Sequence, residues 1–118
     1  MVGSSELVTS TETSDGKAVV RVSGDVDLVS CHDLRRALDE ALEASPHTVV
    51  DFTELSFIDS SGLSVLVEAH KHARDRGGVF VVRNPTPMLR RLLDITRLDS
   101  LLVLETSSDD PPTEGTPG

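Results

Sequence analysis

The chain has 118 residues, which suits one domain with a single core of modest size. Its 20 acidic and 11 basic residues give a net charge of −9, which repels phosphate backbones and anionic lipid, so neither nucleic acid nor a membrane surface is expected as a direct partner. Cys31 is the only cysteine, which excludes an internal disulfide, and the sequence shows neither an apolar run near the ~18 residues of a membrane span nor a basic-then-apolar leader. We therefore expect a soluble, cytoplasmic protein.

Both ends of the chain are polar and have almost nothing to bury. Residues 1–5 are expected to be flexible, and residues 106–118, "TSSDDPPTEGTPG", to form a disordered acidic tail. This leaves one folded domain over residues 6–105. Its first elements are a Thr-rich strand (6–13) and a Val-rich strand (17–24), which the turn signal "SDG" joins into a hairpin.

From Ser30 the apolar residues recur with a helical period, and Ser30 and Asp33 have the spacing of a capping box. A buried strand, "HTVVDF" (47–52), follows this helix. The later elements alternate in the same way: a helix from Ser60 to the Gly77-Gly78 stop, a strand over 79–84, a helix over 86–95 with Thr86 as its cap and Pro87 at its first position, and a strand over 100–105.

The predicted order is therefore β-β-α-β-α-β-α-β. Strands separated by helices imply parallel pairing with right-handed crossovers, and near-continuous apolar runs fit buried central strands. The opening hairpin adds an antiparallel strand. The sequence predicts an α/β protein, a small sandwich with a mixed, mostly parallel β-sheet and helices.

The stretch "FIDSSGL" (57–63) lies where a predicted strand passes into a helix, in a βα connection of the kind that often carries function. The simplest interpretation is that Asp59 or Ser60 caps the helix and that Ser61 helps. A second interpretation makes one serine a nucleophile. A third makes Ser60 a site of regulation.

A nucleophilic serine fits the sequence poorly. A hydrolase elbow needs Gly-x-Ser-x-Gly, whereas Ile58 stands two positions before Ser60. The available bases, His70 and His72, lie more than two helical turns further along and are too far away to take a proton from Ser60. No catalytic residue is assigned, and an enzyme is kept only as the alternative from another class.

Metal binding has equally little support. Asp25 and Asp27 in "GDVD" form a conceivable corner for Mg²⁺, although a solvated turn explains them more simply. The pair Cys31-His32 has no partner pair at zinc-ligand spacing, and no Gly-rich phosphate loop is present. We expect no metal and no cofactor in this chain.

Regulation at Ser60 fits the chemistry best. A serine at an exposed helix N-terminus is accessible to a kinase, and phosphorylation would add about 1.5 to 2 negative charges that the helix dipole tolerates. Beside Asp25, Asp27 and Asp59 that phosphate would make the surface strongly acidic, and a bound partner would have to desolvate the charge or leave. These residues favour a reversible binding module.

The stretch from "VVDFTELSFIDSSGL" to "RGGVFVVRNPTPMLRRLLDITRLDSLLVL" resembles the STAS domain, particularly the free-standing bacterial anti-sigma factor antagonists. "VSGDVDLVSCHDLRRAL" is similar to that family's first strand end, "G-E-x-D", and first helix. The likeness covers about Val19 to Leu104. It implies the STAS fold and a switch between partners in transcription regulation.

The resemblance implies that the unphosphorylated protein binds an anti-sigma factor, a serine kinase of the histidine-kinase-like ATPase fold, and so releases a sigma factor. It places phosphorylation at Ser60 and the partner contact at Asp25, Asp27, Asp59, Ser60, Ser61, Gly62 and Ser64. Within this set, Ser61 is expected to bond the helix start and Gly62 to give close backbone access. A metal-dependent serine phosphatase would reverse the modification, and ATP and Mg²⁺ would belong to the kinase.

Three features depart from the family pattern: Ser64 where Gly is frequent, "TRL" (96–98) where many members have Ser-Gly-Leu or Thr-Gly-Leu, and the acidic tail. Arg97 in a glycine-type conformation would cost about 1 kcal/mol, so a differently built helix end is expected there. The alternative function is a scaffold subunit of a stress-signalling or lipid-transport complex.

Overall fold

A computed structural model describes residues 7–106. The predicted flexible N-terminus over 1–5 and the predicted disordered tail over 106–118, apart from Thr106, lie outside the described residues. The elements run in the order β1 (Val8–Ser14), β2 (Lys17–Val26), α1 (Cys31–Ala44), β3 (His47–Ile58), α2 (Ser60–Asp75), β4 (Val79–Arg83), α3 (Pro87–Ile95), the 3-10 turn η1 (Leu98–Ser100) and β5 (Val103–Glu105). This order confirms the predicted α/β alternation.

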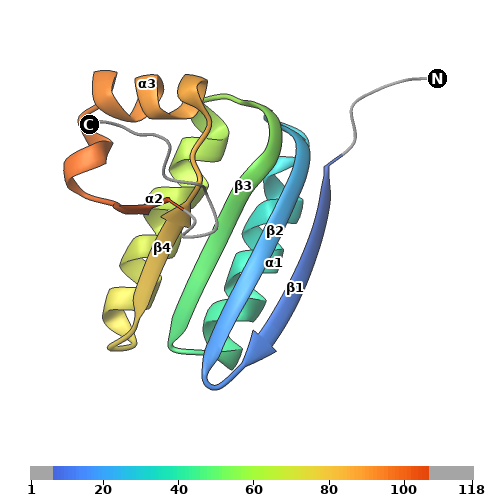
Figure 1. The fold of residues 1–118 in the computed structure, drawn as a ribbon, viewed down its shortest axis with the longest axis vertical. Helices are drawn as coiled ribbons and strands as arrows, with labels where there is room; N and C mark the ends of the chain where they lie inside the picture. Colours follow the sequence, from blue (N-terminus) through green and yellow to red (C-terminus); the bar gives the residue numbers. More distant parts are fainter. Residues whose placement is uncertain (1–6, 107–118) are drawn as a thin grey trace.

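The sheet follows the order of the chain, β1-β2-β3-β4-β5. β1 and β2 form the predicted antiparallel hairpin, and every later pair is parallel. Figure 1 shows α1 and α2 together behind the sheet, with α3 at the end where the parallel strands finish. The carboxyl ends of β2, β3 and β4 therefore share one edge, and the start of α2 lies at that edge.

The core lies between the sheet and the helices. Alternate strand residues face α1 and α2, among them Val20 on β2, Phe52 on β3 and Phe80 on β4, and all three are fully buried. Leu38 of α1 and Leu66 of α2 pack into the same cluster. The three-to-four spacing is the pattern that predicted the helices, whereas the central strands were predicted from short, near-continuous apolar runs.

The Gly77-Gly78 pair ends α2 as predicted. Gly77 has a φ of +74°, and the amides of Gly77 and Gly78 donate to the carbonyls of Arg74 (3.0 Å) and Ala73 (2.8 Å), which is a Schellman motif. A Cβ on Gly78 would lie 2.0 Å from the Pro46 carbonyl oxygen. Only glycine allows α2 to end so close to the start of β3.

Three predictions about element ends are wrong. β3 continues to Ile58 instead of ending near Phe52, because the end of β2 also supplies backbone partners, including Val26 opposite Ile58. The last strand is shorter than predicted and spans only Val103–Glu105, after η1. The third concerns Ser30, which has a helical φ of −83° and makes no side-chain cap bond to α1, so the capping box with Asp33 does not form.

The end of α3 also differs from the prediction. The sequence predicted a differently built helix end, because Arg97 would be strained in a glycine-type conformation. Arg97 nevertheless adopts the left-handed conformation, with φ 65° and ψ 17°. Its amide donates to the Asp94 carbonyl at 3.2 Å, as a glycine there would. The helix end therefore has the backbone conformation that a glycine would give, and the Cβ of Arg97 makes that conformation strained.

Candidate functional site

Asp59 is the residue that starts α2. Its backbone is extended, and its carboxylate Oδ1 accepts from the amides of Ser61 (2.9 Å) and, more weakly, Gly62 (3.4 Å). Its own amide donates to the Val26 carbonyl at 3.1 Å. Of the two predicted caps, Asp59 or Ser60, Asp59 is the correct one, and the β3–α2 connection is reduced to this single residue.

The two adjacent serines have different surroundings. Ser61 is half-buried, and its hydroxyl donates to Asp59 Oδ1, which confirms its expected part in the helix start. Ser60 is exposed, and within residues 7–106 its hydroxyl takes part in no hydrogen bond. The Ser64 hydroxyl, one turn further along, donates to the Ser60 carbonyl at 3.2 Å and not to its side chain. Ser60 is thus the hydroxyl that the helix start leaves accessible.

Gly62 lies on the inner side of the same turn. It is buried, and a Cβ there would lie 2.5 Å from Ile58 Cγ1 and 2.8 Å from Val26 Cγ1. The structure therefore gives Gly62 a packing function, which brings the first turn of α2 close to the ends of β2 and β3. Its predicted contact with a partner stays a prediction.

Asp25 and Asp27 lie on the neighbouring connection. Asp25 is near the end of β2, in register with Phe57 of β3, and Asp27 opens the turn that leads to α1. Because Asp59 is bonded to Val26, between the two acids, the β2–α1 and β3–α2 connections are held side by side. The sequence predicted that these acids lie beside the Ser60 loop, and the backbone places them there.

Ser30 orders the Asp27 turn. Asp27 Oδ1 accepts from the amides of Val29 (3.0 Å) and Ser30 (2.9 Å), and the Ser30 hydroxyl lies 3.0 Å from that oxygen and 2.8 Å from the Asp25 carbonyl. The Ser30 amide, and then its hydroxyl, hold the pKa of the Asp27 carboxyl below its usual range. Sequence reasoning missed this function of Ser30. The Asp-x-x-Ser spacing, typical of Asx turns, is the signal that could have revealed it.

The two histidines of α2, His70 and His72, lie more than two helical turns beyond Ser60. Burial, and secondarily the charge of Arg74, lower the pKa of His70, which fits the predicted position at the edge of the core. His72 Nδ1 lies 3.6 Å from Asp39 of α1. Within residues 7–106, no three His, Cys, Asp or Glu side chains gather as a metal site, and no helix is long and apolar enough to cross a membrane.

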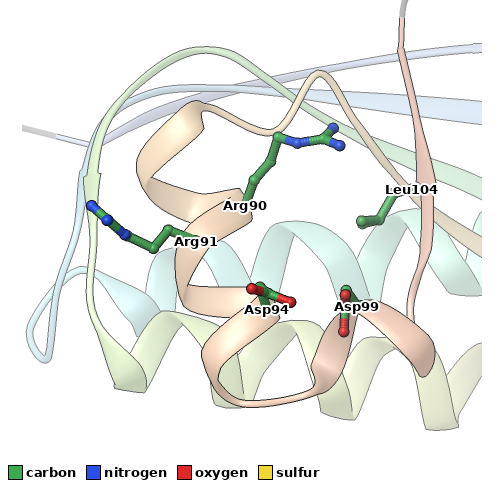
Figure 2. A pocket seen from close by; sticks show the side chains of 5 residues that line it. All are labelled: Arg90, Arg91, Asp94, Asp99 and Leu104. Atoms are coloured by element: carbon green, nitrogen blue, oxygen red, sulfur yellow. The ribbon is translucent and has the colours of Figure 1, made fainter.

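A shallow pocket lies between α3, η1 and β5 and involves none of the predicted site residues. Figure 2 shows its lining, Arg90, Arg91, Asp94, Asp99 and Leu104, with Arg90 extending toward Leu104 and Arg91 pointing the other way. Its two arginines and two aspartates balance in charge, and the lining offers no hydroxyl, thiol or imidazole. This pocket therefore adds no candidate site residue.

Comparison with known proteins gives the family. A family model described as "Mlab, STAS domain" matches residues 9–104. The anti-sigma F factor antagonist of Paenibacillus polymyxa is 34% identical over 89 residues, which cover 74% of this chain and 76% of that protein. The chain belongs to the STAS family of anti-sigma factor antagonists.

Further relatives agree with this assignment. The anti-sigma-B factor antagonist of Bacillus subtilis is 30% identical to this STAS domain over 90 residues, covering 76% of this chain and 83% of the relative. The crystal structure of an anti-sigma factor antagonist from Mycobacterium paratuberculosis superposes with a TM-score of 0.78, at 31% identity and with 89% and 90% of the two chains covered. These relatives are regulatory proteins, and this STAS domain is likewise a regulator and not an enzyme.

Proposed function

We propose that this STAS domain binds an anti-sigma factor while Ser60 is unmodified, and that phosphorylation of Ser60 weakens the complex. The observation that carries the proposal is the different bonding of the two serines at the start of α2. The Asp59 carboxylate accepts from the first helix amides and from the Ser61 hydroxyl, and the exposed Ser60 hydroxyl remains unbonded within the described residues. A charge added there need not disturb the fold.

The family resemblance suggests that the anti-sigma factor is itself the kinase, an ATPase of the histidine-kinase-like fold. Ser60 Oγ would attack the γ-phosphorus of ATP, the bond to the ADP oxygen would break, and the hydroxyl proton would pass to a base of the kinase. ATP and Mg²⁺ would come with that partner, so this chain would need no cofactor. A metal-dependent serine phosphatase would return Ser60 to its hydroxyl form by hydrolysis.

The charge around Ser60 supports the direction of the switch. The N-terminus of α2 favours a phosphate electrostatically, so the free domain tolerates it. In a complex, the same phosphate and the carboxylates of Asp25, Asp27 and Asp59 would have to be desolvated together, which costs several kcal/mol per ion. We therefore place the partner contact over these residues, with Ser61, Gly62 and Ser64 on the same helix start.

The test is a capture experiment with three baits in lysate of the native organism: wild type, Ser60→Asp, and Ser14→Asp. Ser14 is exposed at the hairpin, at the other end of the sheet, and controls for added charge. We expect wild type and Ser14→Asp to retain an ATPase that Ser60→Asp loses, as identified by mass spectrometry. Equal retention by all three baits would leave Ser60 as a helix-start residue only and would favour a scaffold function.

A further inference from the structure

Two adjacent apolar side chains on the β2–α1 connection are highly exposed to solvent. Val29 is 81% exposed and Leu28 is 71% exposed, the highest values among the large apolar residues within 7–106. Single exposed aliphatic residues are normal on a protein surface, whereas here two adjacent ones lie beside the proposed regulatory site. Within residues 7–106, burial does not explain why these two positions are apolar.

The turn that carries the pair is ordered by hydrogen bonds. The Val29 amide donates to Asp27 Oδ1 at 3.0 Å, and the Cys31 amide donates to the Asp27 carbonyl at 2.8 Å. The buried Cys31 thiol donates to the Leu28 carbonyl at 3.3 Å. Leu28 and Val29 are therefore held outward on a fixed backbone, which lowers the conformational entropy that a partner must remove on binding.

The pair also lies close to Ser60. Leu28 follows Val26 by two residues, Ser60 follows Asp59 directly, and Val26 and Asp59 are joined by a hydrogen bond of 3.1 Å. At the reach of an extended chain, this places Leu28 and Ser60 within about 15 Å of each other. A typical interface covers about 800 Å² on each partner, so one footprint includes both positions.

We propose that Leu28 and Val29 form an apolar anchor that inserts into an apolar pocket on the anti-sigma factor whose binding depends on the phosphorylation state of Ser60. This inference rests on the proposed function. A partner surface complementary to this site would have that apolar pocket and, around it, basic or amide groups opposite Asp25, Asp27 and Asp59. Apolar residues at the centre of a contact, with polar groups around them, are the usual source of affinity between proteins.

Charge argues for this occupant over a second copy of the chain. A two-fold contact through the anchor would bring Asp25, Asp27 and Asp59 of one copy against the same residues of the other, between two proteins of net charge −9. The anchor also explains how one phosphate can prevent binding. Insertion of Leu28 and Val29 into the partner would remove water from the surface beside Ser60, and removing the hydration of a phosphate there costs free energy.

The test is titration calorimetry with the purified ATPase that the wild-type bait recovers. The variant is Leu28→Gln/Val29→Thr, and the matched control is Val79→Thr, because Val79 is 46% exposed at the start of β4, at the other end of the sheet. We expect the double variant to bind about tenfold more weakly, or worse, with a less negative heat-capacity change. The control should stay within about twofold of wild type.

The outcomes separate this inference from the proposed function. Wild-type affinity in the double variant, with binding still lost in Ser60→Asp, overturns the anchor and leaves the switch standing. Weak binding by the double variant, with full binding by Ser60→Asp, supports the anchor and removes the switch. Failure of the wild-type bait to capture any ATPase overturns both.

Two further results keep the test decisive. A wild-type dimer in sedimentation that the double variant dissociates would assign Leu28 and Val29 to a second copy and overturn the proposal. If the double variant unfolds, Val29→Thr alone carries the test, because it exchanges a methyl for a hydroxyl at an exposed position.

Discussion

At the scale of single residues, the carboxylate of Asp59 determines which serine is available. It accepts from the amides of Ser61 and Gly62 and from the Ser61 hydroxyl, so the Ser61 hydroxyl has a structural partner and the Ser60 hydroxyl has none within the described residues. The sequence predicted that Asp59 or Ser60 caps the helix and that Ser61 takes part. It could not choose between the two caps, because both side chains accept from helix amides and the choice depends on where the strand ends.

Gly62 gives a prediction about packing. Gly62→Ala should destabilise the fold by about 1–3 kcal/mol, because the new Cβ would overlap Ile58 and Val26 in a close-packed core. Urea unfolding measures the change, with Ser60→Ala on the same turn as the control and little change expected there. An unchanged midpoint for Gly62→Ala would show that the first turn of α2 does not pack against these strands as described.

Asp27 gives a prediction about pH. Hydrogen bonds from Ser30 lower its pKa in the folded state, so its contribution to stability is complete above the unfolded pKa of ~3.9 and is lost as pH falls through the folded pKa. Carboxyl titration by NMR should find Asp27 below ~3.9, and Ser30→Ala should raise its pKa toward that value. An Asp27 pKa that is the same in wild type and Ser30→Ala would contradict this account of the turn.

At the scale of elements, apolar patterns and turn signals predicted every α-helix and strand of the described residues but not the 3-10 turn η1, and the element ends were harder to place. β3 was predicted too short because Thr53, Glu54 and Ser56 interrupt its apolar run. The strand continues through them because β2 offers backbone partners as far as Val26, with two register shifts along the pair. Hydrogen bonding to a neighbouring strand is non-local, so no local pattern could place this end.

The end of α3 carries a prediction of its own. Arg97→Gly should stabilise the protein by about 0.5–1 kcal/mol, because glycine adopts φ 65° without the steric cost of a Cβ. Arg97→Ala is the control, because it removes the side-chain charge and keeps the Cβ. Thermal unfolding should show a gain for glycine alone, and an equal gain for alanine would assign the effect to charge.

At the scale of the whole molecule, the parallel strands bring the functional turn together. β2 and β3 finish at the same edge, so residues more than 30 positions apart, Asp25–Asp27 and Asp59–Ser60, become neighbours. The sequence predicted this neighbourhood and the family resemblance supported it, although composition and spacing alone explained Asp25 and Asp27 more simply as turn residues. The exposure of Leu28 and Val29 had no signal in the sequence, since two aliphatic residues before a helix are equally compatible with burial.

The measurement that tests the central claim most directly is the Kd of the captured ATPase for wild type before and after stoichiometric phosphorylation, with the phosphate mapped to Ser60. The account predicts binding about a hundredfold weaker after phosphorylation, since the complex would then have to bury an unpaired charge, with no change in the fold or unfolding temperature of the free domain. Ser60→Ala treated in the same way should keep its affinity. An equal Kd for the two forms of wild type would contradict the claim that the charge at Ser60 controls association.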